Sequence, residues 1–276
     1  MKAKRIIVAA LVAAVALVLT GPAVAEVITL ADGNSTLQID PESSLGVFNW
    51  SIGDVSKLHQ QWFWFRNNLD DYDDHEYSID QISAPVVFQH AGVPGLAILT
   101  YTDPDRFSVQ VTYLLTGGAG LLTSDLMENV KITNLSAETL TFDIFQYSDF
   151  DLGASGDDSS VRITGGNTAM QTAYGGAMIT LSETVTTGSP DLSETGVFST
   201  TLDKLMDGNV DDLDGSTLAN GPANLTWAFQ WADRAIAPGQ AFMISKDKLL
   251  TMEPVAEPAS LGLIGIALLA LRKKRS

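Results

Sequence analysis

The fold is decided by Phe107-Ser108-Val109-Gln110-Val111-Thr112-Tyr113, a stretch in which apolar and polar side chains alternate with a period of two. Successive side chains of an extended strand point to opposite faces, so this alternation predicts a strand that is buried on one face only. The segments 130–133 and 139–144 repeat the pattern. Turns rich in Gly, Pro, Asn and Asp separate these segments, as is typical of antiparallel sheets.

The rest of the mature chain is also predicted to consist mainly of short strands. One short helix is predicted at 202–206, and the polar stretches 184–196 and 207–221 are predicted to be long loops. Many short strands with no strong helix between them favour an all-β, antiparallel β-sandwich. Further strands are predicted at 36–39, 46–52, 61–66, 85–90, 95–100, 159–163, 177–181, 225–231 and 241–245.

The first 25 residues have the composition of a secretory signal peptide. Basic residues near the start precede the apolar run 6–19, and Ala23 and Ala25 form an Ala-x-Ala cleavage site. We therefore expect export by the secretory machinery, with Glu26 as the first mature residue; the alternative is an uncleaved membrane anchor.

The C-terminal end consists of a short motif, an apolar segment and a basic cluster. Val255, Glu257 and Pro258 lie in the motif, which leads into the apolar segment 261–271. As a helix, this segment would measure about 16 Å, against about 30 Å for a bilayer core, so alone it is a marginal membrane span, and we expect a short transmembrane helix here. Four cations follow and would stay on the cytoplasmic side. These cations are Arg272, Lys273, Lys274 and Arg275.

This arrangement resembles the PEP-CTERM sorting signal of Gram-negative envelope proteins, in which the usual Val-Pro-Glu-Pro is here Val-Ala-Glu-Pro. The resemblance implies an exosortase as partner, transient anchoring in the inner membrane, and then a place at the cell surface or in a secreted matrix. The alternative is a hydrophobic C-terminal helix without a sorting role. The chain is thus predicted to comprise a signal peptide (1–25), a β-sandwich ectodomain (26–252) and a sorting signal (253–276).

Charge and cysteine content exclude several classes of function. Nine of the 16 basic residues and all 33 acidic residues lie between 26 and 257, which gives this part a net charge of about −24. Such a charge repels phosphate, so we expect no binding to nucleic acid. The chain has no cysteine, which excludes disulfides and thiolate catalysis.

Acidic residues gather in three segments, and clustered carboxylates are suitable ligands for calcium. The third segment begins like an EF-hand loop, with Asp207, Asn209 and Asp211 at positions one, three and five. It departs from that pattern at position six, Asp212, and at position twelve, Leu218. Two interpretations stay open, a structural Ca²⁺ site or solvated loops; no other cofactor is expected. The three segments are 70–76, 149–158 and 207–214.

Aromatic side chains form the run 62–65. In a strand, Trp62 and Trp64 share one face while Phe63 and Phe65 share the other, so at least one pair belongs to the core. Buried packing is the favoured interpretation for Trp62 and Trp64. The alternative is an exposed platform on which sugar rings stack.

Evidence for an enzyme is limited in the sequence. Asp149 and Asp151 would share a strand face at about 7 Å, within the range of carboxylate pairs in glycosidases. The three histidines show no metal-binding spacing, and no Gly-x-Ser-x-Gly motif is present. The sequence therefore predicts a structural or adhesive envelope protein without catalysis. The alternatives are a carbohydrate-binding module that contacts extracellular polysaccharide and, third, a polysaccharide-active enzyme.

Overall fold

The computed structural model describes residues 26–118, 122–153, 157–173 and 179–252. The predicted signal peptide and sorting signal, with Val255, Glu257, Pro258 and the basic cluster, lie outside the described residues. Within the described part, no helix has the length and apolar character needed to cross a membrane.

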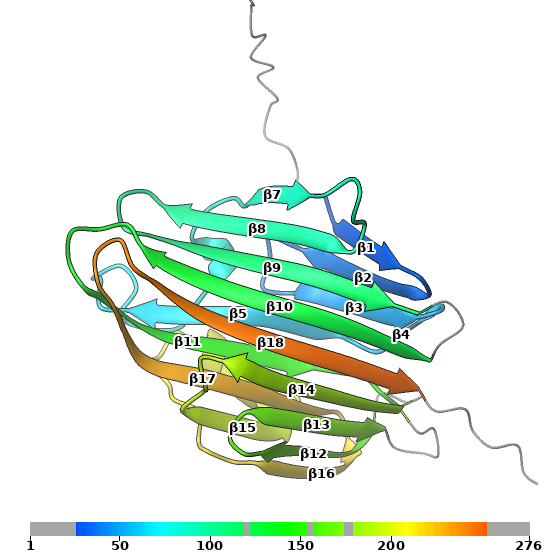
Figure 1. Cartoon of the computed structure of the whole chain (residues 1–276). Coiled ribbons are helices and arrows are strands. Elements are labelled where there is room, and N and C mark those ends of the chain that lie inside the picture. Colours follow the sequence, from blue (N-terminus) through cyan, green and yellow to red (C-terminus); the bar gives the residue numbers. More distant parts are fainter. Residues whose placement is uncertain (1–25, 119–121, 154–156, 174–178, 253–276) are drawn as a thin grey trace, which may run out of the picture.

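Two nine-stranded sheets pack face to face in a β-sandwich (Figure 1). Neighbouring strands are antiparallel except for the short parallel contact between β3 and β5. Sheet A has the order β1 (Ile28–Asp32), β2 (Ser35–Asp40), β3 (Gly46–Ile52), β5 (Gln60–Asn67), β11 (Leu140–Asp149), β17 (Leu225–Ile236) and β15 (Leu192–Val197), with β4 (Val55–Ser56) and β6 (Tyr77–Ser78) at its margin. Sheet B has the order β16 (Leu218–Ala223), β12 (Asp158–Thr164), β13 (Thr168–Ala173), β14 (Ile179–Thr187), β18 (Ala241–Met252), β10 (Thr123–Asn134), β9 (Phe107–Gly117), β8 (Leu96–Asp103) and β7 (Val86–Gln89).

The alternation in β9 explains how the two sheets meet. Phe107, Val109, Val111 and Tyr113 are buried in the sandwich, whereas the polar residues between them are half-buried on the outer face. The predicted antiparallel β-sandwich is therefore confirmed. The predicted helix is also present as α1 (Thr200–Met206).

The interior contains a layer of charged side chains as well as an apolar core. Lys246 and Lys248 of β18 and Glu128 and Glu183 of β10 and β14 are buried between the sheets. The predicted end of the last strand at 245 is therefore wrong. The strand continues to Met252 with lysines at core-facing positions, where the sequence pattern predicts apolar residues.

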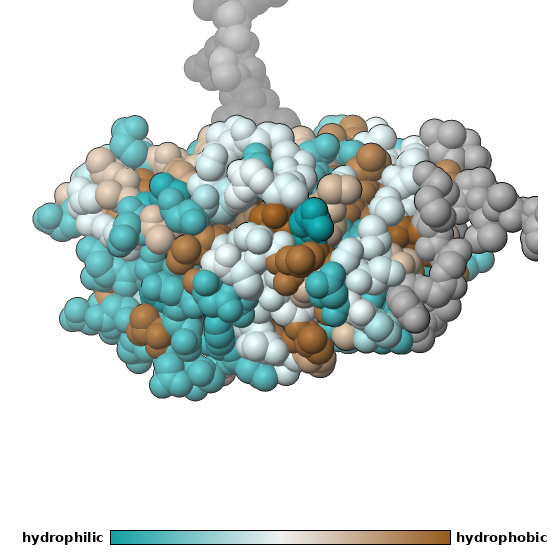
Figure 2. All heavy atoms as spheres, turned by 90° about the horizontal axis from the view of Figure 1, so that it is seen from below, coloured by the Kyte–Doolittle hydropathy of each residue, from teal (hydrophilic) through white to brown (hydrophobic). Residues whose placement is uncertain are grey.

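The predicted long loops also need correction. The segment 184–196 contains the end of β14 and most of β15, and the segment 207–221 contains the start of β16. At the end of the molecule that carries β12 and β16, Figure 2 shows apolar side chains singly or in small groups among hydrophilic ones. The outer face of sheet A, by contrast, is covered by α1 and by the loops around residues 70–76 and 207–214, which form the candidate site.

Candidate functional site

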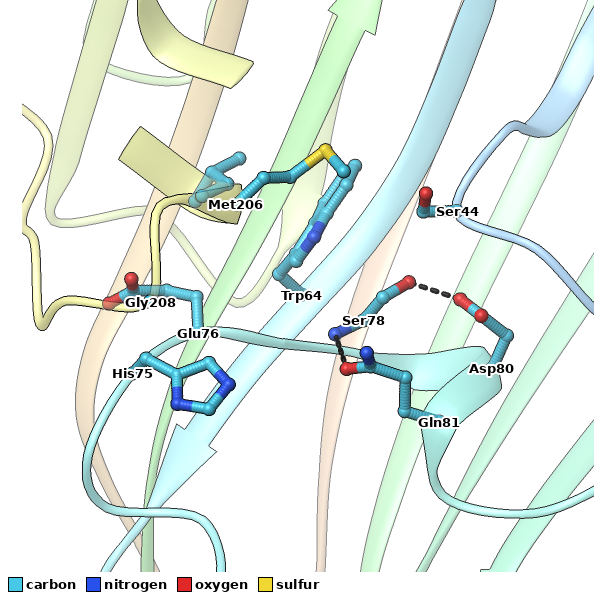
Figure 3. A pocket seen from close by; sticks show the side chains of 10 residues that line it. Ser44, Trp64, His75, Glu76, Ser78, Asp80, Gln81, Met206 and Gly208 are labelled. Carbon is cyan, nitrogen blue, oxygen red and sulfur yellow. Dashed lines mark hydrogen bonds between the residues drawn. The ribbon is translucent and has the colours of Figure 1, made fainter. Parts of the chain in front are cut away.

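A cavity of about 170 Å³ lies on the outer face of sheet A (Figure 3). It is bounded by β5, by the segment from β6 to η1 (Ile79–Gln81), and by the end of α1. The lining combines an indole, a thioether and several polar groups, so it offers both an apolar surface and hydrogen-bonding groups. Among the lining residues are Trp64, His75, Glu76, Asp80, Gln81 and Met206.

Both candidate tryptophans are buried. Trp62 has an exposed fraction of 0% and Trp64 of 1%, so neither forms an open platform. The Trp62 indole N–H donates to Asp80 Oδ1 at 3.0 Å. Trp64 instead lines the cavity, where the exposed Met206 side chain lies next to its ring (Figure 3). Only Trp64 is therefore placed where a ligand could contact it.

Glu76 is the most unusual group of the cavity. Its Oε1 atom accepts hydrogen bonds from Arg66 at 2.5 Å and from the Asp211 N–H at 3.1 Å. Its Oε2 atom is buried without a hydrogen-bond partner. Burial raises the pKa of Glu76, although the hydrogen bonds from Asp211 and Arg66 act in the opposite direction. Glu76 thus has one oxygen held by two hydrogen bonds and one buried oxygen without a partner, the kind of perturbed carboxyl group that marks candidate functional sites.

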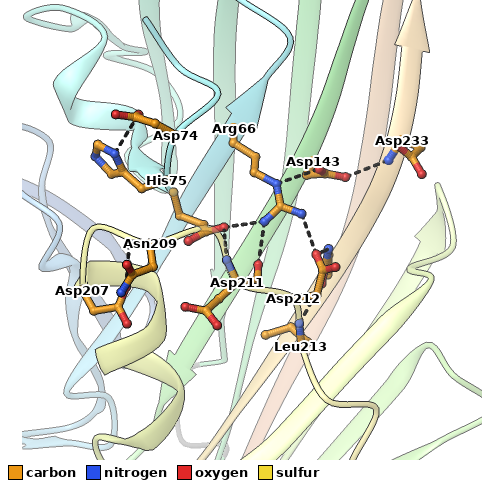
Figure 4. A network of polar contacts seen from close by, with 12 residues as sticks. Arg66, Asp74, His75, Asp143, Asp207, Asn209, Asp211, Asp212, Leu213 and Asp233 are labelled. Atoms are coloured by element: carbon orange, nitrogen blue, oxygen red, sulfur yellow. Dashed lines mark hydrogen bonds and ion pairs between the residues drawn. The ribbon is translucent and has the colours of Figure 1, made fainter. Parts of the chain in front are cut away.

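Arg66 organises the loops around the cavity (Figure 4). Its guanidinium donates to Asp143 of β11 at 2.8 Å, to Asp212 at 2.5 Å and to the Asp211 carbonyl at 2.6 Å, in addition to Glu76. The planar fork of donors suits several carboxylates at once. The acidic loop 207–214 is therefore tied to sheet A by an arginine.

The predicted calcium ligands lie at the start of the same loop. Asp207 Oδ1 accepts the Asn209 N–H at 2.8 Å, and the backbone of Asp211 contacts Glu76. In the described part of the chain, no three His, Asp or Glu side chains converge as a ready metal site. Calcium binding by Asp207, Asn209 and Asp211 stays a prediction.

A second group of carboxylates lies at the end of β11. Asp149 ends the strand and is fully buried, whereas Asp151 lies beyond it and is half-buried. Burial raises the pKa of Asp149 to about 7, and the charges of Asp151 and Asp158 add to this effect. Asp149 and Asp151 are therefore near each other, but not on one regular strand as predicted.

The sequence interpretation did not identify Arg66 or Met206, and it placed Glu76 only in the acidic segment 70–76, as a possible calcium ligand. For Arg66 the sequence contained one signal: Arg66 follows Trp64 by two residues, so both side chains lie on the same face of β5. The contact between Arg66 and Asp212 joins positions far apart in the chain and has no local signature.

No family model and no curated protein matches this chain. Solved structures do share its fold. A bacterial glucoamylase complexed with acarbose aligns with a TM-score of 0.54 and 11% identity, over 90% of this chain and 36% of that one. A polysaccharide lyase aligns with a TM-score of 0.52 and 13% identity, over 80% and 33%. A galactose mutarotase-like protein from Lactobacillus casei aligns with a TM-score of 0.50 and 11% identity, over 83% and 100%.

At 11–13% identity, these structural alignments show a shared fold and no more than that. The chain spans about a third of the glucoamylase and of the lyase, but the whole of the mutarotase-like protein. The comparisons contradict the prediction of a structural or adhesive protein without catalysis, because proteins with this sandwich include enzymes that process carbohydrate.

Proposed function

We propose that this chain acts on carbohydrate and that the cavity beside Trp64 receives a sugar ring. The observation that carries this proposal is Glu76, whose buried Oε2 atom has no partner although it belongs to the lining of the cavity. The shared fold with carbohydrate-processing enzymes supports the substrate class.

The size and chemistry of the cavity fit one ring. Its volume of about 170 Å³ is close to that of an engineered cavity of about 150 Å³ that binds benzene. The indole of Trp64 offers a flat apolar surface to the C–H face of a sugar, while Asp80 and Gln81 offer polar atoms to its hydroxyls. Met206 is exposed and flexible, so its movement would open the indole to the ligand.

Glu76 would carry the chemistry by exchanging a proton with a sugar oxygen. Arg66 holds Oε1, which leaves Oε2 without a partner at the lining of the cavity, and burial raises the pKa of the carboxyl group above its ordinary value. General acid–base catalysis of this kind contributes about 10²- to 10⁴-fold in rate. The second candidate function is carbohydrate binding without turnover. The observation that supports it is the size of the cavity, which has room for one sugar ring.

The test separates binding from turnover. Neutral monosaccharides and oligosaccharides are screened for binding by calorimetry, and for anomer interconversion or bond cleavage by NMR. Glu76→Gln keeps the shape of the side chain, so we expect binding to persist and turnover to fall at least 100-fold. Glu138→Gln, at an exposed site, is the matched control.

Binding by the wild-type protein without any turnover would instead support the binding-module interpretation. A wild-type protein that binds none of these sugars would contradict the proposal as a whole.

We also propose export, processing by an exosortase and release to the cell surface or secreted matrix. The signal-like residues 1–25, with Ala23 and Ala25, and the motif at Glu257 and Pro258 support this. Replacing Glu257 and Pro258 by alanine should leave an unprocessed, membrane-retained form. Equal processing of variant and wild type, measured by mass spectrometry, would contradict the proposal.

A further inference from the structure

A group of oxygen atoms without hydrogen-bond partners lies where β11 ends. Both carboxylate oxygens of Asp149 are buried and unpartnered, and so are Thr226 Oγ1 and Asn224 Oδ1. Asp149 and Thr226 have exposed fractions of 0%. Buried polar atoms are nearly always hydrogen-bonded in proteins, so several unpartnered oxygens in one place call for a ligand.

Strand pairing brings these atoms together on one face of sheet A. Thr226 of β17 lies directly opposite Asp149 of β11, and side chains so paired have Cβ atoms about 4.5–5.5 Å apart. Asn224 precedes Thr226 by two residues, and its side-chain amide lies within hydrogen-bonding reach of the Asp149 carboxyl group and lowers the pKa of that group, while the Asn224 Oδ1 atom stays without a partner. Tyr147, two residues before Asp149 on the same face, has an unpartnered hydroxyl as well.

The charges around the group are mostly negative. Asp151 and Asp158 both act on Asp149 as like charges. The nearby ammonium group serves other partners. The Lys57 ammonium donates to the Leu152 carbonyl at 3.2 Å, and its charge acts on Asp151. Within the described residues, Asp149 forms no ion pair, and a buried carboxylate without a partner is costly.

We propose that Asp149, Asn224 and Thr226 bind a hard divalent cation of the calcium type. Asp149 would supply two oxygens, and Asn224 and Thr226 one each, with water in the remaining positions. All these donors are oxygens, as calcium requires, and none is the nitrogen or sulfur that zinc prefers. The cation would neutralise the carboxylates at the end of β11. This site is separate from the EF-hand-like loop at Asp207, and its three ligand residues are not among those that line the proposed sugar cavity.

The purified protein is tested with calcium alone. Saturating calcium, at about 100 times Kd, should raise the melting temperature by about 5–10 °C relative to EDTA. Asp149→Asn keeps the volume of the side chain, so it should fold in EDTA yet lose the calcium response. Asp207→Asn is the matched control and should respond like the wild type.

Terbium gives a second readout, because Tyr147 lies beside the site and can sensitise terbium luminescence. We expect Asp149→Asn to weaken terbium binding at least tenfold, and calcium to displace terbium from the wild type. The proposal is overturned if calcium leaves the melting temperature of the wild type unchanged, or if Asp149→Asn responds like the wild type. Loss of the response in Asp207→Asn alone would move the site to the predicted loop.

Discussion

The Lys246 ammonium and the Glu128 carboxylate lie 2.7 Å apart, with both side chains completely buried between the two sheets. Lys248 forms a further ion pair with the same carboxylate, and Lys246 lies 4.5 Å from the centre of the Phe63 ring in the opposite sheet. Burial alone would raise the pKa of Glu128, but the two ammonium groups hold it below its ordinary value. The ion pairs therefore link three neighbouring strands of sheet B, and Lys246 reaches sheet A through its contact with the Phe63 ring.

Removing one member of this layer should be strongly destabilising. Glu128→Gln leaves Lys246 and Lys248 with Glu183 as their remaining anionic partner, and breaking a buried ion pair costs about 3–5 kcal/mol. Urea unfolding of the variant should show a loss of this size. Lys131→Met, at an exposed position of the same strand, should change stability by less than about 0.5 kcal/mol. Equal stability of Glu128→Gln and wild type would show that the layer is not ionised.

This layer also explains how far the fold could be predicted. The alternation in β9 and the strand at 46–52 were clear, because core-facing positions there are apolar. In β18 two of the core-facing positions hold lysine, so the alternation of apolar and polar residues is interrupted after 245 and the predicted strand ends there. A strand with buried charges has no local signature, because the partners that permit burial come from other strands.

The candidate site was predictable only in part. Trp64 was identified from its place in an aromatic strand, and the acidic loops from their composition. Their relation depends on Arg66, whose contacts reach Asp143 and Asp212, and such long-range contacts are not contained in the periodicity of any one segment. The cavity is therefore a property of the tertiary structure.

Arg66 should be irreplaceable by lysine. Arg66→Lys keeps the charge but cannot donate to Glu76, Asp143 and Asp212 at the same time, so we expect a loss of about 2 kcal/mol. Arg106→Lys is the control, because its ion pairs are more exposed and worth about 0–1 kcal/mol. Chemical unfolding measures both variants. Similar losses in the two would contradict a special role of the Arg66 network.

The outer face of sheet B contains a pair of repelling carboxylates. Burial raises the pKa of Asp125 to about 6, with a further contribution from Asp247. Between about pH 4 and pH 6 the folded protein holds a proton that the unfolded chain has released, so this group makes stability fall as pH rises through that window. Asp125→Asn should therefore be more stable than wild type above pH 6, by about 1 kcal/mol after allowance for solvent screening. Melting curves from pH 4 to 8 test this; a variant that is less stable at pH 7 would contradict it.

Gly46 should be far less tolerant of a side chain than Gly53, although both have positive φ. At Gly46, φ is +57° and an added Cβ would lie 2.0 Å from Trp62 Cε3, whereas at Gly53, φ is +68° and no atom lies within 4 Å of the added Cβ. Gly53→Ala should cost only the backbone strain, about 1 kcal/mol. Gly46→Ala adds the displacement of a fully buried indole, which brings the expected loss of stability to about 3 kcal/mol.

Because Trp62 also donates to Asp80 beside the cavity, the displacement should weaken ligand binding in Gly46→Ala and not in Gly53→Ala. Urea unfolding and sugar calorimetry on the two variants test the argument, and equal losses of stability would show that Trp62 does not pack against Gly46 in solution.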